Sequence, residues 1–132
     1  LFRNMNPNVL IGFHSHDNMS LSMANTITAI ENGADMVDGT YTGMGRGGGN
    51  LRLELITLYL ALNKDYNFEL SDLFEYLDVY ITDESRKKRT KEAICGMLNV
   101  HPYRLDQIKE KPISEIFEEL RVLDLDKKKR YP

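Results

Sequence analysis

The chain has 132 residues, enough for one modest core or two small domains. Its apolar content of 42% and charged content of 28% are typical of a globular protein, and a net charge of −3 argues against a nucleic-acid-binding surface. With Cys95 as the single cysteine, an internal disulfide is excluded and a reducing, cytoplasmic compartment is expected. No apolar run approaches the roughly 18 residues of a membrane span, so we expect no membrane partner. The chain opens on Leu1 instead of methionine, and we therefore expect a fragment of a longer protein.

The first half of the sequence alternates strand and helix patterns. The apolar run 9–14 is typical of a strand covered on both faces in a parallel sheet. Apolar residues at helical spacing follow over 20–31, then a second short strand over 36–40. The glycine-rich loop 43–49 leads into another helical pattern at 51–63. Strand and helix in regular alternation predict an α/β fold with parallel strands.

The second half shows helical periods throughout. We expect helices over residues 70–80, 91–98, 103–109 and 114–123. The charged run 83–89 is interpreted as an exposed connector between two of them. The change of pattern predicts two domains, an α/β part over 1–65 and a helical part over 66–132.

Two histidines stand where the first strand ends. Strand alternation has a period of two, so His14 and His16 share one face while Ser15 points to the other. Two neutral imidazoles on one face can reach the same divalent ion. A hydrogen-bonded pair without metal is the plainer interpretation, but the carboxyl end of a strand in a βα unit is where α/β folds place ligands.

The glycine-rich loop supplies further candidates. Asn50 directly after it is either a third metal ligand or the N-cap of the next helix. Gly45 and Gly47 allow close approach of a ligand to the backbone, and Arg46 between them can pair with a carboxylate or phosphate. A solvated surface arginine is the alternative for Arg46. The loop lacks the spacing of a Walker or dinucleotide fingerprint.

Three segments resemble a known enzyme family. Residues 12–25 (GFHSHDNMSLSMAN) look like the seventh strand and helix of metal-dependent TIM-barrel aldolases and lyases. Residues 33–40 (GADMVDGT) and 43–50 (GMGRGGGN) look like the eighth strand and its loop. The group includes 4-hydroxy-2-oxovalerate aldolases, 3-hydroxy-3-methylglutaryl-CoA lyases and isopropylmalate-type synthases, and the motifs resemble the first branch most.

The resemblance implies site residues and a cofactor. It makes His14 and His16 ligands of a divalent metal, Mn²⁺ or Mg²⁺ rather than Zn²⁺, with Asn50 as a ligand or a neighbour. It places Arg46, Gly45 and Gly47 with the substrate. His101 or Tyr103 falls near a tyrosine that assists proton transfer in the family. The family's remaining ligand, an aspartate, and its enolate-stabilising arginine come from a first strand that this chain does not contain.

The resemblance also implies the fold and the activity. We expect the last βα units of a (β/α)₈ TIM barrel followed by a small all-helical domain, since a whole barrel takes about 250 residues. The expected activity of the parent protein is cleavage of a 4-hydroxy-2-oxo acid into pyruvate and an aldehyde, with this piece alone inactive. We further expect a homo-oligomer, with an aldehyde dehydrogenase as a further partner. The alternatives are an acyl-CoA condensing synthase of the isopropylmalate type and a non-catalytic partner-binding or assembly module.

Overall fold

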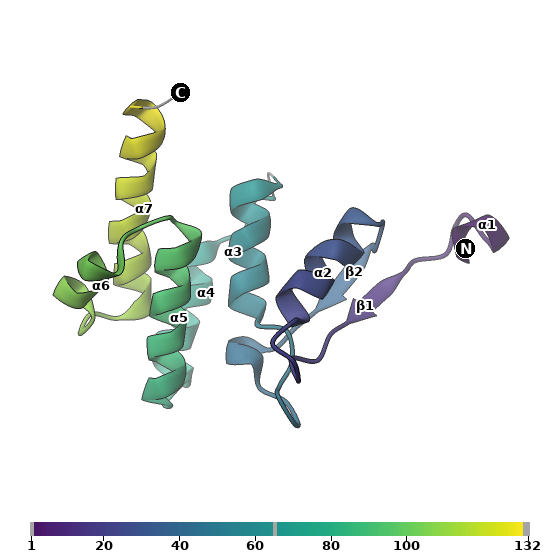
Figure 1. The fold of residues 1–132 in the computed structure, drawn as a ribbon, viewed down its shortest axis with the longest axis horizontal. Helices are drawn as coiled ribbons and strands as arrows, with labels where there is room; N and C mark the ends of the chain where they lie inside the picture. The colour runs from purple at the N-terminus through teal and green to yellow at the C-terminus, as the bar shows by residue number, and fades with distance from the viewer. Residues whose placement is uncertain (1, 65, 131–132) are drawn as a thin grey trace. The chain divides into compact units, whose positions relative to one another are not determined.

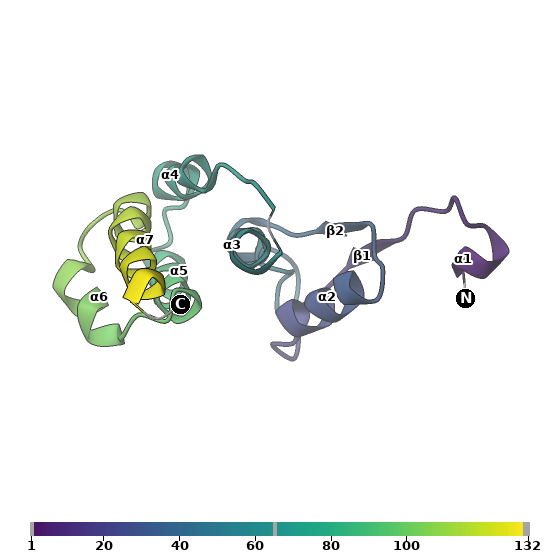
Figure 2. The same ribbon diagram turned by 90° about the horizontal axis from the view of Figure 1, so that it is seen from above.

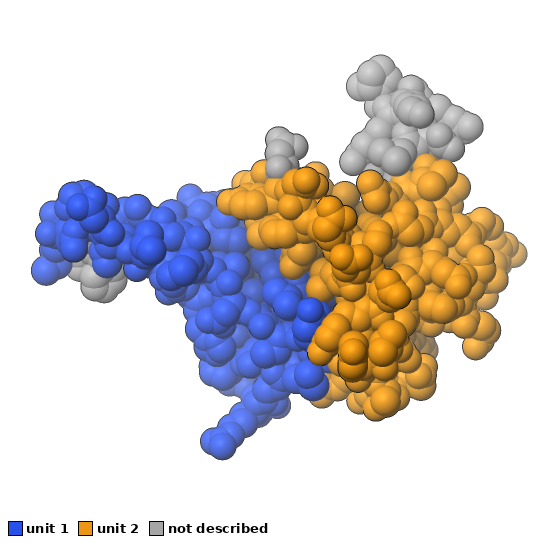
Figure 3. All heavy atoms as spheres, turned by 180° about the vertical axis from the view of Figure 1, so that it is seen from behind, with its two compact units in different colours: residues 1–56 blue, residues 57–132 orange. Residues whose placement is uncertain are grey.

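The computed structural model describes residues 2–64 and 66–130, without the side chains of residues 2, 102 and 124–130. The chain forms two compact units, residues 1–56 and 57–132, coloured blue and orange in Figure 3. The predicted domain boundary after Asp65 stays a prediction, and Asp65 itself lies outside the described residues. Within the described residues, no helix is long and apolar enough to cross a membrane.

The first unit is built around two parallel strands joined by a helix (Figure 1). Its elements are α1 (Phe2–Met5), β1 (Gly12–His14), α2 (Ser22–Glu31), β2 (Met36–Asp38), the 3₁₀ turn η1 (Tyr41–Gly43) and the start of α3 (Leu53–Asn63). The register pairs Gly12 with Met36, Phe13 with Val37 and His14 with Asp38. The predicted strand–helix–strand order is therefore confirmed.

Local signals in the sequence set the ends of α2. The carboxylate of Asp17 accepts the backbone N–H of Ser22 at 3.0 Å and so satisfies a free donor of the first turn. At the other end Gly33 adopts φ +92°, and its N–H donates to the carbonyl of Ile30. A left-handed glycine of this kind closes many helices.

Asp35 ties the N-terminal helix to the sheet. One oxygen of its carboxylate accepts both the guanidinium of Arg3 (2.7 Å) and the backbone N–H of Ile11 (2.8 Å). These two hydrogen bonds hold the pKa of the Asp35 carboxyl below its usual value, and the bond from Arg3 has the larger effect. The carboxylate thereby joins α1 to the residues just before β1.

The two strands are more exposed than the sequence predicts. The apolar run 9–14 predicted a strand covered on both faces, yet Leu10 is 67% exposed and Met36 54% exposed. Within the described residues, β1 pairs with β2 and with no other strand. The expectation of burial was wrong for this chain because an apolar run shows only what a strand can bury, and no other described residue covers Leu10 or Met36 by more than about half.

The second unit is all helical, as predicted. It comprises α4 (Leu70–Tyr80), α5 (Glu84–Met97), α6 (Pro102–Ile108) and α7 (Ile113–Arg130) after the end of α3. Figure 2 shows α4 and α5 alongside α7, with α6 packed on α5. The rings of Phe74 and Phe117 meet at 4.7 Å in the core between α4 and α7, and each buried ring contributes about 1.5–3 kcal/mol. Cys95 is buried here, and this burial raises the pKa of its thiol.

The interpretation of residues 83–89 as a connector was wrong, because this charged run opens α5. Asp83 is the N-cap, and its carboxylate accepts the backbone N–H groups of Ser85 and Arg86. Lys88 pairs with Glu92 one turn further along, at 3.9 Å. A good cap and charge pairs at helical spacing make a helix out of a segment that carries few apolar residues.

Candidate metal centre

His14 and His16 lie at the carboxyl end of β1. Both are exposed, whereas Ser15 between them is buried, so the alternation places the histidines on one face as predicted. Their rings meet edge to face with centroids 4.9 Å apart. This spacing brings two imidazoles into the neighbourhood of one point, which is what a shared ion requires.

Asp38 fixes the ring of His14. The strand register places the two residues side by side, and Nδ1 of His14 is hydrogen-bonded to Oδ1 of Asp38. A carboxylate on Nδ1 makes this nitrogen the donor and leaves Nε2 with its lone pair for a ligand. Asp17 and Asn18, which follow the two histidines directly in the sequence, bond elsewhere: Asp17 to Ser22 and Asn18 to Gly48.

The glycine-rich loop folds back onto the residues after β1. The N–H of Asp17 donates to the carbonyl of Gly49 at 2.8 Å, and the N–H of Gly48 donates to Oδ1 of Asn18 at 2.8 Å. A Cβ at Gly48 would lie 2.6 Å from the backbone of Asn18, so the approach demands glycine there. The fold-back sets His16 opposite Asn50 in an isolated antiparallel bridge.

Asn50 presents an oxygen that has no partner. Its Nδ2 donates to the carbonyl of Met44 at 3.1 Å, while its Oδ1 is buried and accepts no hydrogen bond among the described residues. The N-cap alternative is wrong, because α3 begins at Leu53, three residues later. A buried acceptor without a donor is costly, and an ion would relieve that cost.

The donor set fits a divalent ion. Two imidazole nitrogens and one amide oxygen are ligands that divalent metals accept, and Asn50 faces His16 across the bridge. Among the described residues, no three His, Cys, Asp or Glu side chains form a metal-binding group by themselves. The structure therefore brings His14 and His16 together at the end of β1, with Asn50 opposite His16, and their role as metal ligands stays a prediction.

The three loop residues predicted to bind substrate lie beside this group. Arg46 is exposed at the loop, where its carbonyl accepts the N–H of Gly49 at 3.1 Å. A Cβ at Gly45 would lie 2.8 Å from the side-chain amide of Asn50, so glycine leaves room for that amide. Gly47 has φ +63°, a conformation that favours glycine. Their role toward a substrate stays a prediction.

His101 and Tyr103 belong to the second unit. His101 is the N-cap of α6, and its Nδ1 accepts the N–H of Tyr103 at 3.2 Å. Tyr103 is 66% exposed. The structure thus gives His101 a capping role, and the catalytic role of the two residues stays a prediction.

The buried ion pair between Arg52 and Glu54 was not predicted from the sequence. Glu54 is 0% exposed, and Arg52 donates to its Oε1 through two nitrogens, each at 2.9 Å. The other carboxylate oxygen, Oε2, accepts the backbone N–H of Thr42 at 2.9 Å. The available signal was a glutamate in the first turn of a helix that is otherwise almost wholly apolar.

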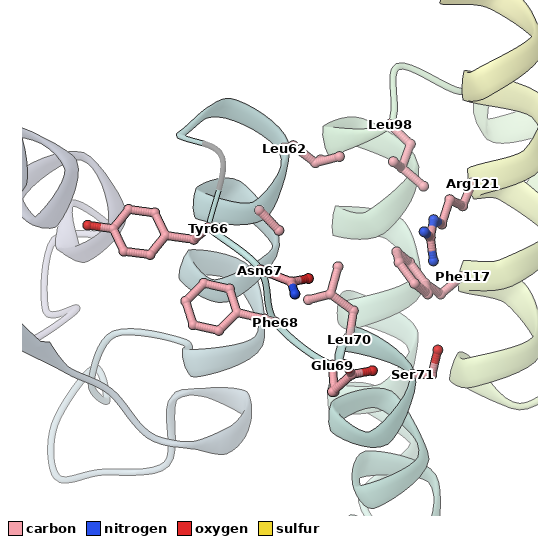
Figure 4. A pocket seen from close by; sticks show the side chains of 11 residues that line it. Leu62, Tyr66, Asn67, Phe68, Glu69, Leu70, Ser71, Leu98, Phe117 and Arg121 are labelled. Carbon is pink, nitrogen blue, oxygen red and sulfur yellow. The ribbon is translucent and has the colours of Figure 1, made fainter.

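The second unit contains a pocket of about 310 Å³ (Figure 4). Leu62, Leu98 and Phe117 give it an apolar side. Arg121 at the pocket already pairs with Glu118 at 3.7 Å and lies 6.0 Å over the ring of Phe117. None of the predicted site residues lines this pocket.

The comparisons with known proteins agree with the motifs. The sequence profile of the HMGL-like family matches residues 1–79. The 4-hydroxy-2-oxovalerate aldolase of Thermomicrobium roseum is 44% identical over 73 residues, which are 52% of this chain and 20% of that protein. The enzyme of the same name from Stutzerimonas stutzeri is 42% identical over 76 residues, 57% of this chain and 21% of that protein. That from Shewanella woodyi is 32% identical over 101 residues, 74% of this chain and 30% of that protein.

This chain therefore spans between 20% and 30% of the length of these curated relatives. One solved structure, titled "Crystal structure of the N-terminal domain of a putative aldolase from Bacteroides vulgatus", is 31% identical and covers 86% of this chain and 35% of its own, with a TM-score of 0.48. The family profile covers more than half of the chain, including the two histidines and the glycine-rich loop. The chain is a member of the HMGL-like family.

Proposed function

We propose that this chain is part of a divalent-metal-dependent aldolase that cleaves a 4-hydroxy-2-oxo acid into pyruvate and an aldehyde. The observation that carries the proposal is the edge-to-face pair of His14 and His16 at the end of β1, with Asn50 opposite His16 in a backbone bridge and its buried Oδ1 without a hydrogen-bond partner among the described residues. The relatives named 4-hydroxy-2-oxovalerate aldolase support the reaction type and the substrate class.

The predicted site residues have distinct tasks in this proposal, and Asn50 would add its Oδ1 to the two histidines as a ligand. His14 and His16 would hold Mn²⁺ or Mg²⁺, with Zn²⁺ less favoured, and Asp38 keeps Nε2 of His14 available for the ion. When bound, the ion supplies Lewis-acid polarisation of the 2-oxo group and its carboxylate. Arg46, with the adjacent Gly45 and Gly47, binds the anionic end of the substrate. His101 or Tyr103 would assist a proton transfer, as the family resemblance predicts, while the base for the 4-hydroxyl group stays unassigned.

The surroundings of the site belong to the same proposal. β1 and β2 would be the last two strands of a (β/α)₈ barrel, whose earlier strands cover the exposed Leu10 and Met36. The missing carboxylate ligand and the enolate-stabilising arginine would come from the first strand. The parent protein would form a homo-oligomer with an aldehyde dehydrogenase as partner.

The test uses the full-length protein that contains this chain. His14→Ala and His16→Ala are expected to lose the bound metal and at least about a hundredfold in kcat, because each removes a ligand but little core packing. Metal content is measured by mass spectrometry and pyruvate release by a coupled assay. Val79→Ala, at a 64% exposed position of α4, is the control and should retain both metal and activity. Stoichiometric metal together with full activity in both histidine variants would refute the metal assignment.

A further inference from the structure

Glu54 is a buried carboxylate that ties α3 to the turn η1. It lies in the first turn of α3, where it is 0% exposed. Oε1 receives two hydrogen bonds from Arg52, while Oε2 receives the backbone N–H of Thr42. A buried charge is stable only when it is paired in this way, so loss of one contact disturbs the whole arrangement.

The partner of Glu54 has an unusual backbone conformation. Thr42 adopts φ 55° and ψ 15°, in the left-handed region, and its side chain is buried. A β-branched residue in this region is a real outlier that the surroundings must hold in place. The hydrogen bond from the Thr42 N–H to Glu54 is such a restraint.

The two residues after Thr42 orient Asn50. The carbonyl of Gly43 accepts the backbone N–H of Asn50, and the carbonyl of Met44 accepts its Nδ2, both at 3.1 Å. A carbonyl can only accept, so the NH₂ group must face Met44 and Oδ1 must point away from it. That Oδ1 is buried and has no hydrogen-bond partner among the described residues.

We infer that Glu54 is a positioning residue of the metal centre. By holding Thr42 in the left-handed conformation, it fixes the carbonyls of Gly43 and Met44, and these carbonyls set the direction of Asn50 Oδ1. The inference rests on the ligand role proposed above for Asn50. Glu54, on α3, would thus affect metal binding without contacting the ion itself.

The first experiment replaces Glu54 in the full-length protein. Glu54→Gln keeps the shape of the side chain but turns one acceptor into a donor, so residue 54 loses its hydrogen bond either with the Thr42 N–H or with Arg52. We expect Mn²⁺ affinity to fall by about tenfold in calorimetric titration, as for other groups that hold a ligand in place. Without metal, hydrogen exchange followed by mass spectrometry should show faster exchange across residues 42–50.

A rescue experiment separates positioning from general stability. Glycine adopts positive φ without steric cost, so Thr42→Gly removes the need for the restraint. The double variant Thr42→Gly with Glu54→Gln should bind Mn²⁺ within about threefold of Thr42→Gly alone, because the two residues act through one contact. Asp78→Asn is the matched control, since Asp78 also accepts backbone N–H groups from an element distant in the sequence, the start of α7, but lies in the helical unit. It should lower the thermal midpoint and leave Mn²⁺ affinity unchanged.

Two results would overturn the inference: unchanged exchange over residues 42–50 in Glu54→Gln, or an equal loss of Mn²⁺ affinity in Glu54→Gln and Asp78→Asn. If the wild-type protein itself bound no metal, the proposed function would fail, and hydrogen exchange alone would then decide the role of Glu54. If the wild-type protein bound metal and released pyruvate normally, and Glu54→Gln matched it in Mn²⁺ affinity and hydrogen exchange, only the positioning role would fail.

Discussion

At the scale of single residues, the start of α6 combines a capping histidine with an exposed phenol. Nδ1 of His101 accepts the N–H of Tyr103, which commits one ring nitrogen to the helix end. The Tyr103 side chain is exposed, and its hydroxyl can give or take a proton. The cap leaves Nε2 of His101, so His101 and Tyr103 both remain candidates for the proton-transfer role that the family resemblance predicts.

Tyr103→Phe in the full-length protein should lower kcat by at least about a hundredfold while leaving Mn²⁺ affinity unchanged, because the ring stays and only the hydroxyl is lost. Steady-state pyruvate release and calorimetric titration measure the two quantities. Tyr80→Phe, another exposed tyrosine of the helical unit, is the control and should behave as wild type. A normal kcat in both Tyr103→Phe and His101→Ala would remove these residues from the reaction.

The sequence predicted the placement of His14 and His16 because alternation along a strand is a local property. It did not predict the contact between His14 and Asp38, since that contact depends on the register between two strands separated by a helix. The unpartnered oxygen of Asn50 depends on a hydrogen bond across the folded loop, and sequence spacing does not encode such a bond. Residue type alone was enough to nominate Asn50, but only the fold shows which of its atoms is available.

At the scale of elements, α7 receives its N-terminal cap from another helix. The carboxylate of Asp78 on α4 accepts the backbone N–H groups of Ile113 (2.6 Å) and Ser114 (2.9 Å), and the hydroxyl of Ser114 (2.7 Å). Such a charged acceptor satisfies donors that would otherwise be left open at the start of a helix. It also fixes the position of α7 along α4.

Asp78→Ala should destabilise the helical unit by about 2 kcal/mol, because three hydrogen bonds to a charged group are lost. Urea unfolding followed by circular dichroism measures the change. Asp72→Ala, an exposed position on the same helix, is the control and should stay within about 0.5 kcal/mol of wild type. Equal effects of the two substitutions would show that the tie between the helices adds no stability.

The N-cap of α5 makes stability depend on pH. The hydrogen bond from Ser85, followed in size of effect by that from Arg86, lowers the pKa of the Asp83 carboxyl. In the same unit, the hydrogen bond from Lys111 lowers the pKa of the Glu119 carboxyl. A carboxyl with a lowered folded-state pKa stabilises the fold above its unfolded pKa, and this stabilisation is lost as the pH falls through the folded-state value.

Asp83→Asn keeps a capping oxygen but cannot titrate. Between about pH 5 and about pH 2 this variant should therefore lose less stability than the wild-type chain. Thermal unfolding across that range provides the measurement. Ser85→Ala should also reduce the pH dependence, since Ser85 is the largest cause of the shift. Parallel curves for wild type and Asp83→Asn would contradict the assignment.

Amphipathic helices were predictable and the charged one was not. The expected helix over 70–80 agrees with α4, because its apolar stripe repeats at helical spacing. The first half of α5 carries no such stripe, and its cap and ion pairs stabilise it instead. Over residues 83–89, the N-cap residue Asp83 was therefore a better indicator of a helix than the apolar periodicity.

At the scale of the whole molecule, the first unit exposes apolar strand surface. Leu10 and Met36 are more than half exposed, and β1 and β2 form a sheet of two strands. A two-stranded sheet is only marginally stable by itself, and unpaired strand edges favour association with other chains. The barrel remains a proposal for the parent protein, because two strands do not determine how a sheet closes.

Residues 1–132 alone should bind Mn²⁺ at least about tenfold more weakly than the full-length protein and release no pyruvate, because the proposed function takes a further carboxylate ligand from another strand. Calorimetric titration and the coupled pyruvate assay test both expectations. Light scattering on the same sample should show self-association, which Leu10→Lys is expected to reduce by placing a charge on the exposed surface. Turnover by this piece comparable to that of the full-length protein would refute the expectation.

The burial of Cys95 gives the helical unit a built-in reporter. The thiol is 2% exposed, and its raised pKa keeps it protonated and slow to react with alkylating reagents. Since the sequence contains no second cysteine, every labelling event marks an opening of α5 and its surroundings. The labelling rate thus measures how often this unit opens under native conditions, without introducing a probe or a substitution.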